Sequence, residues 1–185
     1  MKVKIVVAAT GEEVIAEIRP ARLDDVILWQ RWKGQMPAAA EDAHWRWDEY
    51  ILLAEMHPRE LACFILLAEG EAQGLMLLEL EHENDLGEKD IHGLHISTAP
   101  WNRLPEKRFK YVGSLLVAIA VKLSIARGCE GRLWLESLPG AEGFYRRLGM
   151  IELGERSPGE GLVQFKFDAD RAASFSRKME EGFLE

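Results

Sequence analysis

The sequence predicts an α/β protein in which a mixed β-sheet is flanked by helices. Short apolar runs typical of strands alternate with segments of helical periodicity along most of the 185 residues. A long apolar helix pattern separates the strand-like segments 91–97 (IHGLHIS) and 131–137 (GRLWLES). Because strands joined by a crossover helix run parallel, we expect these two strands to be parallel neighbours. The length suits one domain, and an apolar fraction of 48% is enough for a sizeable core.

The N-terminal third is expected to form a hairpin followed by two helices. In residues 2–19, two apolar segments flank TGEE, in which Gly11 can take the turn. A first helix is expected over 26–33 (VILWQRWK), and a second over 38–58 (AAAEDAHWRWDEYILLAEMHP), where Pro58 stops it. Four tryptophans of this region are expected to pack in the core or in a lid: Trp29, Trp32, Trp45 and Trp47.

The rest of the chain alternates strands, loops and helices. Further strands are expected at 62–70, 72–83, 150–154 and 161–167. The polar segment 83–90 (ENDLGEKD) is expected to be a turn. The long loop 98–113 leads into an amphipathic helix whose apolar face contains Val112, Leu115, Leu116, Ile119, Leu123 and Ala126. A short helix over 141–149 and a helical tail over about 168–185 complete the expected order.

Composition limits the classes of partner. The formal net charge of -8 argues against nucleic acid, because a nucleic-acid footprint needs a basic surface. The most apolar segment, 113–121, is too short to span a bilayer, so we expect no membrane association. Cys63 and Cys129 form no CxxC pair, which favours reduced, buried thiols and a cytoplasmic location. The five histidines show no metal-binding spacing, so no metal is expected.

The segment 108–114 (RFKYVGS) has features of a loop that binds phosphate at the start of a helix. The first N–H groups of a helix lack intrahelical acceptors and carry partial positive charge. Gly113 lets the backbone approach a ligand, and Ser114 can add a hydroxyl. Four cations lie in or near this segment: Arg103, Lys107, Arg108 and Lys110. With a single glycine, a solvated basic loop before a core helix is an equally good interpretation.

A second segment, 139–150 (PGAEGFYRRLGM), places a tyrosine in a short helix that follows a strand. The hydroxyl of Tyr145 could donate a proton to a leaving group there. Taken alone, packing by Phe144 and Tyr145 is the simpler interpretation.

Together, the two segments resemble the GNAT acyltransferase superfamily over about residues 14–167. That family's loop reads R/Q-x-x-G-x-G/A, which Arg108 and Gly113 match, while Tyr111 stands where the family has its first glycine. The later segment reads A-x-x-F-Y-x-x-x-G-F, and its matches here are Ala141, Phe144, Tyr145 and Gly149, with Met150 in place of Phe. The segment 18–25 (IRPARLDD) is similar to the family's opening strand-to-helix turn. The resemblance implies a GNAT-type mixed central sheet in a single domain, 1–185.

The resemblance also implies an N-acetyltransferase that moves an acetyl group from acetyl-CoA, its cosubstrate, directly to a primary amine of a small molecule or peptide. The loop backbone would hold the pyrophosphate, residues 95–97 would pair with the pantetheine arm, and Tyr145 would protonate the departing thiolate. The implied cofactor-binding residues are His95, Ile96, Ser97, Arg108, Phe109, Lys110, Tyr111, Val112, Gly113, Ser114 and Tyr145. Direct transfer requires no reactive cysteine. In that family the region of the two N-terminal helices caps the acceptor site, so the resemblance also implies that the four tryptophans could form an aromatic wall for an apolar or cationic substrate. A monomer or homodimer is expected.

The acceptor amine must lose a proton before attack, and a carboxylate or histidine could take it. The candidates for this base are Glu79, Glu81, His92, His95 and Glu136. Glu79 and His95 are the leads, and Glu79 is taken as the catalytic residue; Glu79 and Glu81 share one strand face by period two. A catalytically weak CoA-binding sensor or regulatory module on the same fold is the alternative, favoured by Tyr111. A toxin that acetylates aminoacyl-tRNA is disfavoured by the negative charge.

Overall fold

The computed structural model describes residues 1–83, 87–103, 105, 107–155, 159 and 161–181. The strands are β1 (Lys2–Val7), β2 (Glu13–Pro20), β3 (Leu61–Ala68), β4 (Glu71–Glu83), β5 (Lys89–Thr98), β6 (Phe109–Lys110), β7 (Leu133–Ser137), β8 (Ile151–Glu155) and β9 (Val163–Phe167). The α-helices are α1 (Val26–Lys33), α2 (Trp47–Met56), α3 (Val112–Ala126), α4 (Glu142–Leu148) and α5 (Ala169–Glu181).

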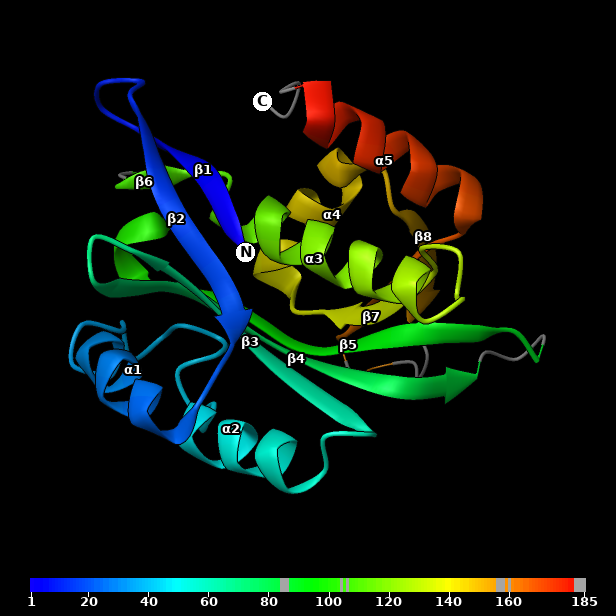
Figure 1. Ribbon diagram of the computed structural model, residues 1–185, viewed down its shortest axis with the longest axis horizontal. Helices are drawn as coiled ribbons and strands as arrows, with labels where there is room; N and C mark the ends of the chain where they lie inside the picture. Colours follow the sequence, from blue (N-terminus) through cyan, green and yellow to red (C-terminus); the bar gives the residue numbers. More distant parts are fainter. Residues whose placement is uncertain (84–86, 104, 106, 156–158, 160, 182–185) are drawn as a thin grey trace. The chain divides into compact units, whose positions relative to one another are not determined.

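Within the described residues, these nine strands form one mixed sheet in the order β6-β1-β2-β3-β4-β5-β7-β9-β8, which confirms the predicted α/β class. The chain divides into two compact units. Unit 1 comprises Met1–Leu77 and His95–Leu116, and unit 2 comprises Leu78–Leu94 and the chain from Val117 onward. Strands β4 and β5 and helix α3 each run through both units (Figure 1). The single-domain organisation stays a prediction.

In unit 1, β1 and β2 form the predicted antiparallel hairpin, and Gly11 takes a left-handed φ of 76° in its turn. Further strands pair with both edges of the hairpin: β3 pairs with β2, and the short strand β6 pairs with β1. Strand β6 was not expected from the sequence. It ties the segment that begins at Phe109 to the edge of the sheet, directly before helix α3.

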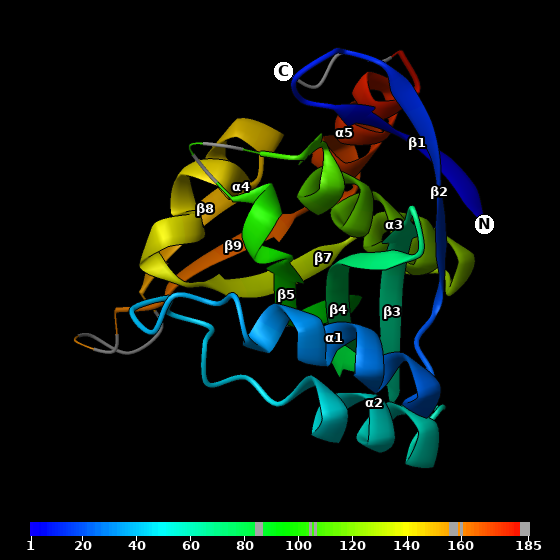
Figure 2. The same ribbon diagram turned by 90° about the vertical axis from the view of Figure 1, so that its left-hand side faces the viewer.

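Helices α1 and α2 lie along one face of β3 (Figure 2). Helix α1 has the predicted bounds, and the indole N–H of its buried Trp32 donates to the carbonyl oxygen of Ala72 at 2.8 Å. The helix predicted over 38–58 is wrong in its first half, because α2 begins only at Trp47. Residues 38–46 instead form turns, in which the N–H of Trp45 donates to the carbonyl oxygen of Asp42.

In unit 2, β5 and β7 are parallel neighbours, as predicted, with Ile91 opposite Leu133. Strands β7, β9 and β8 follow as antiparallel pairs, and α4 ends at Gly149 with a left-handed φ of 85°. The rings of Phe167 and Phe175 stack at 5.1 Å, which packs α5 against β9. Part of the turn predicted over 83–90 lies outside the described residues, and β4 and β5 flank it.

Both cysteines are buried, as predicted. Burial raises the pKa of the Cys63 thiol to about 12, which keeps it protonated and unreactive at neutral pH. Cys129 is likewise buried and forms no disulfide. In the part of the chain that the structure describes, none of the helices combines the length and the apolar character needed to cross a membrane.

Candidate functional site

In unit 1 the loop before α3 ends at Tyr111, which has an unusual backbone conformation. Tyr111 adopts a left-handed φ of 69°, and its carbonyl oxygen accepts a hydrogen bond from the N–H of Leu115 at 2.9 Å. The N–H groups of Val112, Gly113 and Ser114 precede the first intrahelical bond, so they have no acceptor four residues earlier in a helix. Tyr111 therefore takes the conformation that glycine adopts at lower cost, at the position where a glycine was expected.

The Arg108 guanidinium is already engaged by carboxylates. It forms ion pairs with Glu69 and Glu71, at 2.6 Å to Glu69, and lies 5.3 Å from the ring centroid of Phe109. The backbone is also fixed: the N–H of Arg108 donates to the carbonyl oxygen of Trp101 at 2.7 Å. The Arg108 side chain therefore stabilises this loop through its ion pairs, and the helix start adds the partial positive charge of its backbone N–H groups.

A buried ionic network lies at the end of β5. Asp42 is 8% exposed and accepts two hydrogen bonds from Arg103, at 2.8 and 2.7 Å, and one from the hydroxyl of Ser97 at 2.6 Å. Burial raises the pKa of Asp42, but the bonds from Arg103 and Ser97 outweigh it and hold the pKa below its ordinary value. Sequence reasoning missed Asp42, because it lay inside the helix predicted over 38–58.

His95, a lead for the base, is enclosed by aromatic rings. Its imidazole stacks on Tyr50 at 4.3 Å with an interplanar angle of 13°, and lies 4.5 Å from the ring of Trp45. Trp47 packs edge-on against the same imidazole at 6.4 Å. The tryptophans expected as core or as a wall are therefore divided: Trp47 is buried, while Trp45 is half-buried beside His95.

Tyr145 is buried in unit 2, 6% exposed, on the short helix α4. Its ring lies 5.0 Å from Phe144 and 5.6 Å from Phe165. Burial raises the pKa of the phenol well above its ordinary value, so the hydroxyl is protonated at neutral pH. This protonation state suits a hydrogen-bond or proton donor.

Glu79 and His92 come together in unit 2 with three residues that the sequence analysis did not propose. We define the histidine cluster as Glu79, His82, Asp90, His92 and Trp134. Glu79 accepts a hydrogen bond from Nδ1 of His92 at 3.1 Å, and buried Asp90 pairs with Nδ1 of His82 at 2.5 Å. Both imidazoles pack on the indole of Trp134, with ring centroids 5.4 Å away for His82 and 4.2 Å for His92.

Burial lowers the pKa of His92 below its ordinary value, against the opposing effect of the hydrogen bond to Glu79. Glu136, another predicted candidate, faces His92 closely enough to oppose this shift electrostatically. The positive form of His92 is therefore disfavoured, and the neutral ring that can accept a proton predominates at neutral pH.

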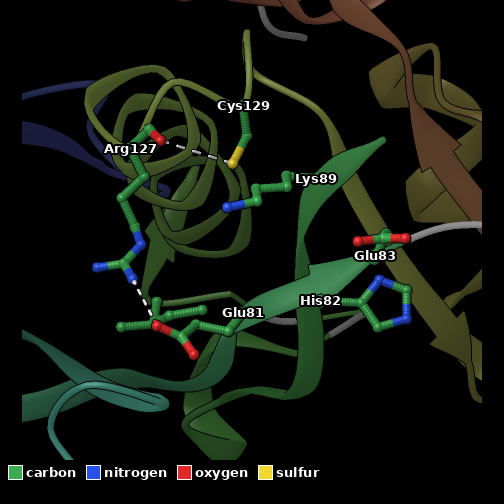
Figure 3. A pocket seen from close by; sticks show the side chains of 7 residues that line it. Glu81, His82, Glu83, Lys89, Arg127 and Cys129 are labelled. Atoms are coloured by element: carbon green, nitrogen blue, oxygen red, sulfur yellow. Dashed lines mark hydrogen bonds and ion pairs between the residues drawn. The ribbon is translucent and has the colours of Figure 1, made fainter. Parts of the chain in front are cut away.

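Glu79 and Glu81, predicted to lie on one strand face, have different partners. Glu79 pairs with His92, whereas Glu81 pairs with a cation. Glu81 lies 3.9 Å from the guanidinium of Arg127. Glu81 and Arg127 line a cavity of about 310 Å³ at the β4–β5 end of unit 2, together with Leu80, His82, Glu83, Lys89 and Cys129 (Figure 3). In Figure 3 the His82 ring and the Glu81 carboxylate extend in opposite directions from β4.

Each predicted cofactor-binding residue can be placed in one of the two units. Unit 1 contains His95–Ser97 and the segment 108–114, and unit 2 contains Tyr145 and the candidate base Glu79. Among the described residues, no group of three or more histidine, cysteine or acidic side chains could hold a metal ion.

Comparison with known proteins supplies the fold family. No family model matches the chain, and no curated protein matches its sequence significantly. Solved structures do match. The apo structure of FdhC, a nucleotide-linked sugar GNAT, has a TM-score of 0.66 at 14% identity, and the match covers 99% of this chain and 97% of that one. The chain has the fold of the GNAT N-acetyltransferases.

Two further GNAT structures match at similar identity. One is PaiA N-acetyltransferase from Thermoplasma acidophilum in complex with coenzyme A, with a TM-score of 0.56, 14% identity and coverage of 82% of this chain and 97% of that one. The other is a chimera of the spermidine N-acetyltransferase SpeG from Vibrio cholerae and hSSAT, with a TM-score of 0.60, 15% identity and coverage of 85% and 98%. At these identities the likeness establishes the GNAT fold and leaves the acceptor unassigned.

Proposed function

We propose that the protein is an acetyl-CoA-dependent N-acetyltransferase that moves an acetyl group directly to a primary amine of a small molecule or peptide. The observation that carries the proposal is the left-handed Tyr111 at the start of α3, on a GNAT fold. Tyr111 stands where the family's loop has its first glycine, and it adopts a left-handed φ of the kind that glycine takes without steric cost. A matching GNAT structure is a complex with coenzyme A, and another is a spermidine N-acetyltransferase by name, which supports the reaction class.

In the proposed role of the loop, backbone N–H groups of Val112, Gly113 and Ser114 bind the pyrophosphate of CoA. A helix N-terminus attracts anions through these donors and through its dipole. Residues 95–97 would bind the pantetheine arm as an added strand. We assign Arg108 a supporting role, because its guanidinium is held by Glu69 and Glu71.

The proposed chemistry needs no covalent enzyme intermediate. The neutral amine attacks the thioester carbonyl carbon, a C–N bond forms and the C–S bond breaks. Tyr145 supports the departing thiolate sulfur by donating a hydrogen bond or its proton from a hydroxyl that burial keeps protonated at neutral pH, and a tyrosinate formed in this step regains its proton from water. The amine proton passes to a base, and CoA leaves as the thiol.

The test uses purified full-length protein. Thermal unfolding with and without CoA should show a CoA-dependent rise in Tm, since a ligand that binds only the folded state stabilises it. Acetyl-CoA with a broad panel of primary amines should release CoA thiol in an amine-dependent manner. Absence of both the shift and amine-dependent release would reject the acetyltransferase proposal.

A CoA-binding sensor is the second candidate, and the pairing of Arg108 with Glu69 and Glu71 favours it, because these carboxylates add negative charge beside the loop. This candidate predicts a Tm rise with CoA and no amine-dependent release. It also predicts that Tyr145→Phe has no measurable effect.

A further inference from the structure

The sheet of unit 2 has one apolar and one polar face. Strand register places Leu133 opposite Phe167 and Leu135 opposite Phe165, and all four residues are buried. Phe165 contacts Tyr145 of α4, and Phe167 stacks on Phe175 of α5, so these helices pack on the apolar face.

The alternate positions form a polar row. His92 lies opposite Trp134 on the parallel strand pair, and Trp134 lies opposite Lys166 on the antiparallel pair. By the same alternation Glu136 shares this face with Trp134. The row places the Trp134 ring beside titratable groups from three strands: His92 of β5, Glu136 of β7 and Lys166 of β9.

Carboxylates orient both histidines of the histidine cluster. An ionised carboxylate can only accept a hydrogen bond. Glu79 therefore favours the tautomer of His92 that carries its hydrogen on Nδ1, and this tautomer has a lone pair on Nε2. Asp90, 4% exposed, orients His82 in the same way. The rings of His82 and His92 lie 5.2 Å apart against Trp134, so each fixes the position of the other.

The charges around His92 also suit a proton acceptor. Glu79 and Glu136 both favour its protonated form, while burial and His82 oppose it. Its side chain is only 15% exposed. The His92 ring is therefore neutral at pH 7, and the carboxylates of Glu79 and Glu136 stabilise the imidazolium that forms when the ring accepts a proton.

Resting on the proposed acetyltransferase function, we propose that the histidine cluster is where the acceptor amine is deprotonated. Nε2 of His92 takes the proton, Glu79 is its positioning residue, and the Trp134 ring supports the cationic acceptor by cation–π contact. The substrate class is a primary ammonium compound. The step is R–NH₃⁺ plus neutral His92 giving R–NH₂ plus imidazolium; the amine then attacks acetyl-CoA, and the imidazolium returns its proton to water.

This assignment replaces Glu79 as the base. The carboxylate of Glu79 is committed to Nδ1 of His92, and an imidazole has a proton affinity closer to that needed near neutral pH. His95, the other lead, is packed between aromatic rings of unit 1.

The first experiment measures binding without turnover. Imidazole ¹⁵N NMR of the full chain, with signals assigned by single His→Asn variants, is followed during addition of methylammonium, n-butylammonium, benzylammonium and 1,4-butanediammonium chlorides. At least one salt should shift the His92 signals saturably, whereas neutral n-butanol and the exposed His44 should show no response. If no salt moves the His92 signals, the proposed site is wrong.

The second experiment uses the amine that the wild type acetylates fastest. His92→Asn retains an N–H near the Nδ1 position but has no base, so kcat/KM for the amine should fall about 100-fold or more. Glu79→Gln should cost about 10-fold, as loss of an orienting partner does. Glu83→Gln, an exposed carboxylate on the same strand, is the matched control and should stay within about twofold of wild type.

The pH profile separates chemistry from structure. Activity of the wild type should fall as pH drops through the pKa of His92, below its ordinary value of 6.5, because the imidazolium cannot accept a proton. That acid limb should vanish in His92→Asn. Wild-type kcat/KM in His92→Asn would overturn the assignment. Each variant should keep the CoA-dependent Tm shift, which shows that it is folded and still binds CoA. The acetyltransferase proposal itself is judged on the wild type, so its failure can be distinguished from failure of the His92 assignment.

Discussion

Arg103 holds Asp42 through two parallel hydrogen bonds, Nη1 to Oδ1 at 2.8 Å and Nη2 to Oδ2 at 2.7 Å, across 61 residues of sequence. Nη2 of Arg103 also reaches the hydroxyl of Ser97 at 3.1 Å and the carbonyl oxygen of Thr98 at 2.9 Å. The network therefore fixes the turns that contain Asp42 to the end of β5. It sets the position of Ser97, one of the residues proposed to bind the pantetheine arm.

Asp42→Asn should lower the free energy of unfolding by about 3–5 kcal/mol, because it leaves the Arg103 guanidinium without its buried counter-charge. Urea denaturation followed by tryptophan fluorescence measures the change. Asp48→Asn, which removes a partner of the exposed Arg46, is the control and should cost less than about 1 kcal/mol. Equal effects of the two substitutions would contradict a special role for the buried network.

Acid titration should show the same network. Because the folded-state pKa of Asp42 is below the unfolded value of 3.8, its contribution to stability is fully present above pH 3.8. The contribution is lost as pH falls through the folded pKa, since protonation then occurs in both states. The stability difference between wild type and Asp42→Asn should therefore shrink below about pH 4. A difference that stays constant down to pH 2 would exclude the ionised carboxylate as its source.

Gly74→Ala should destabilise the start of α3. A Cβ atom at Gly74 would lie 2.8 Å from Cδ1 of Leu116 and 3.0 Å from Cγ1 of Val112, both buried on that helix. Overpacking of this kind costs about 1–3 kcal/mol, which thermal unfolding would detect. Gly34→Ala meets no atom within 4 Å and is the matched control. A stable Gly74→Ala variant would show that β4 and α3 can separate without strain.

Much of the fold could be predicted because its elements carry their own signals. Alternation and Gly11 identified the hairpin, and helical periodicity identified α3. The predicted apolar face of that helix is only partly right, because Leu116 is buried as expected but Ala126 is exposed. The helix predicted over 38–58 failed in residues 38–46. Asp42 there bonds to Ser97 and Arg103, 55 and 61 residues away, and such partners leave no local trace.

The site could be predicted only where a contiguous motif marks it. Segment 108–114 lies at the start of α3, as expected, but nothing in the segment indicates that Arg108 is taken by Glu69 and Glu71. Glu79 and His92 were proposed separately from the sequence, but their grouping with His82 was missed for a geometric reason. Glu79 and His82 are three residues apart, which regular alternation assigns to opposite strand faces, yet both contact His92.

Tyr111→Gly should leave the fold intact and raise its stability by up to about 1–2 kcal/mol, because glycine adopts a left-handed φ without the steric cost that a Cβ carries. CoA affinity should be kept or increased, since the backbone N–H groups are unchanged. Tyr111→Val is the opposing variant: a β-branched residue at φ 69° should lower the Tm. Loss of CoA binding in Tyr111→Gly would show that the tyrosine side chain itself contacts the cofactor.

Tyr145→Phe removes one hydroxyl and keeps the ring between Phe144 and Phe165, so stability should change by less than about 1 kcal/mol. CoA affinity should be unchanged, while kcat for amine acetylation should fall about 100-fold, the usual contribution of a positioned acid. Because burial raises the pKa of Tyr145 above its ordinary value of 10.0, the hydroxyl is protonated throughout the neutral range. The loss should therefore be independent of pH between about 6 and 9. Phe165→Leu is the control: it loosens the same packing and keeps the Tyr145 hydroxyl, so it should lower the Tm without a matching loss of kcat. A Tyr145→Phe variant with wild-type kcat would favour the CoA-binding sensor.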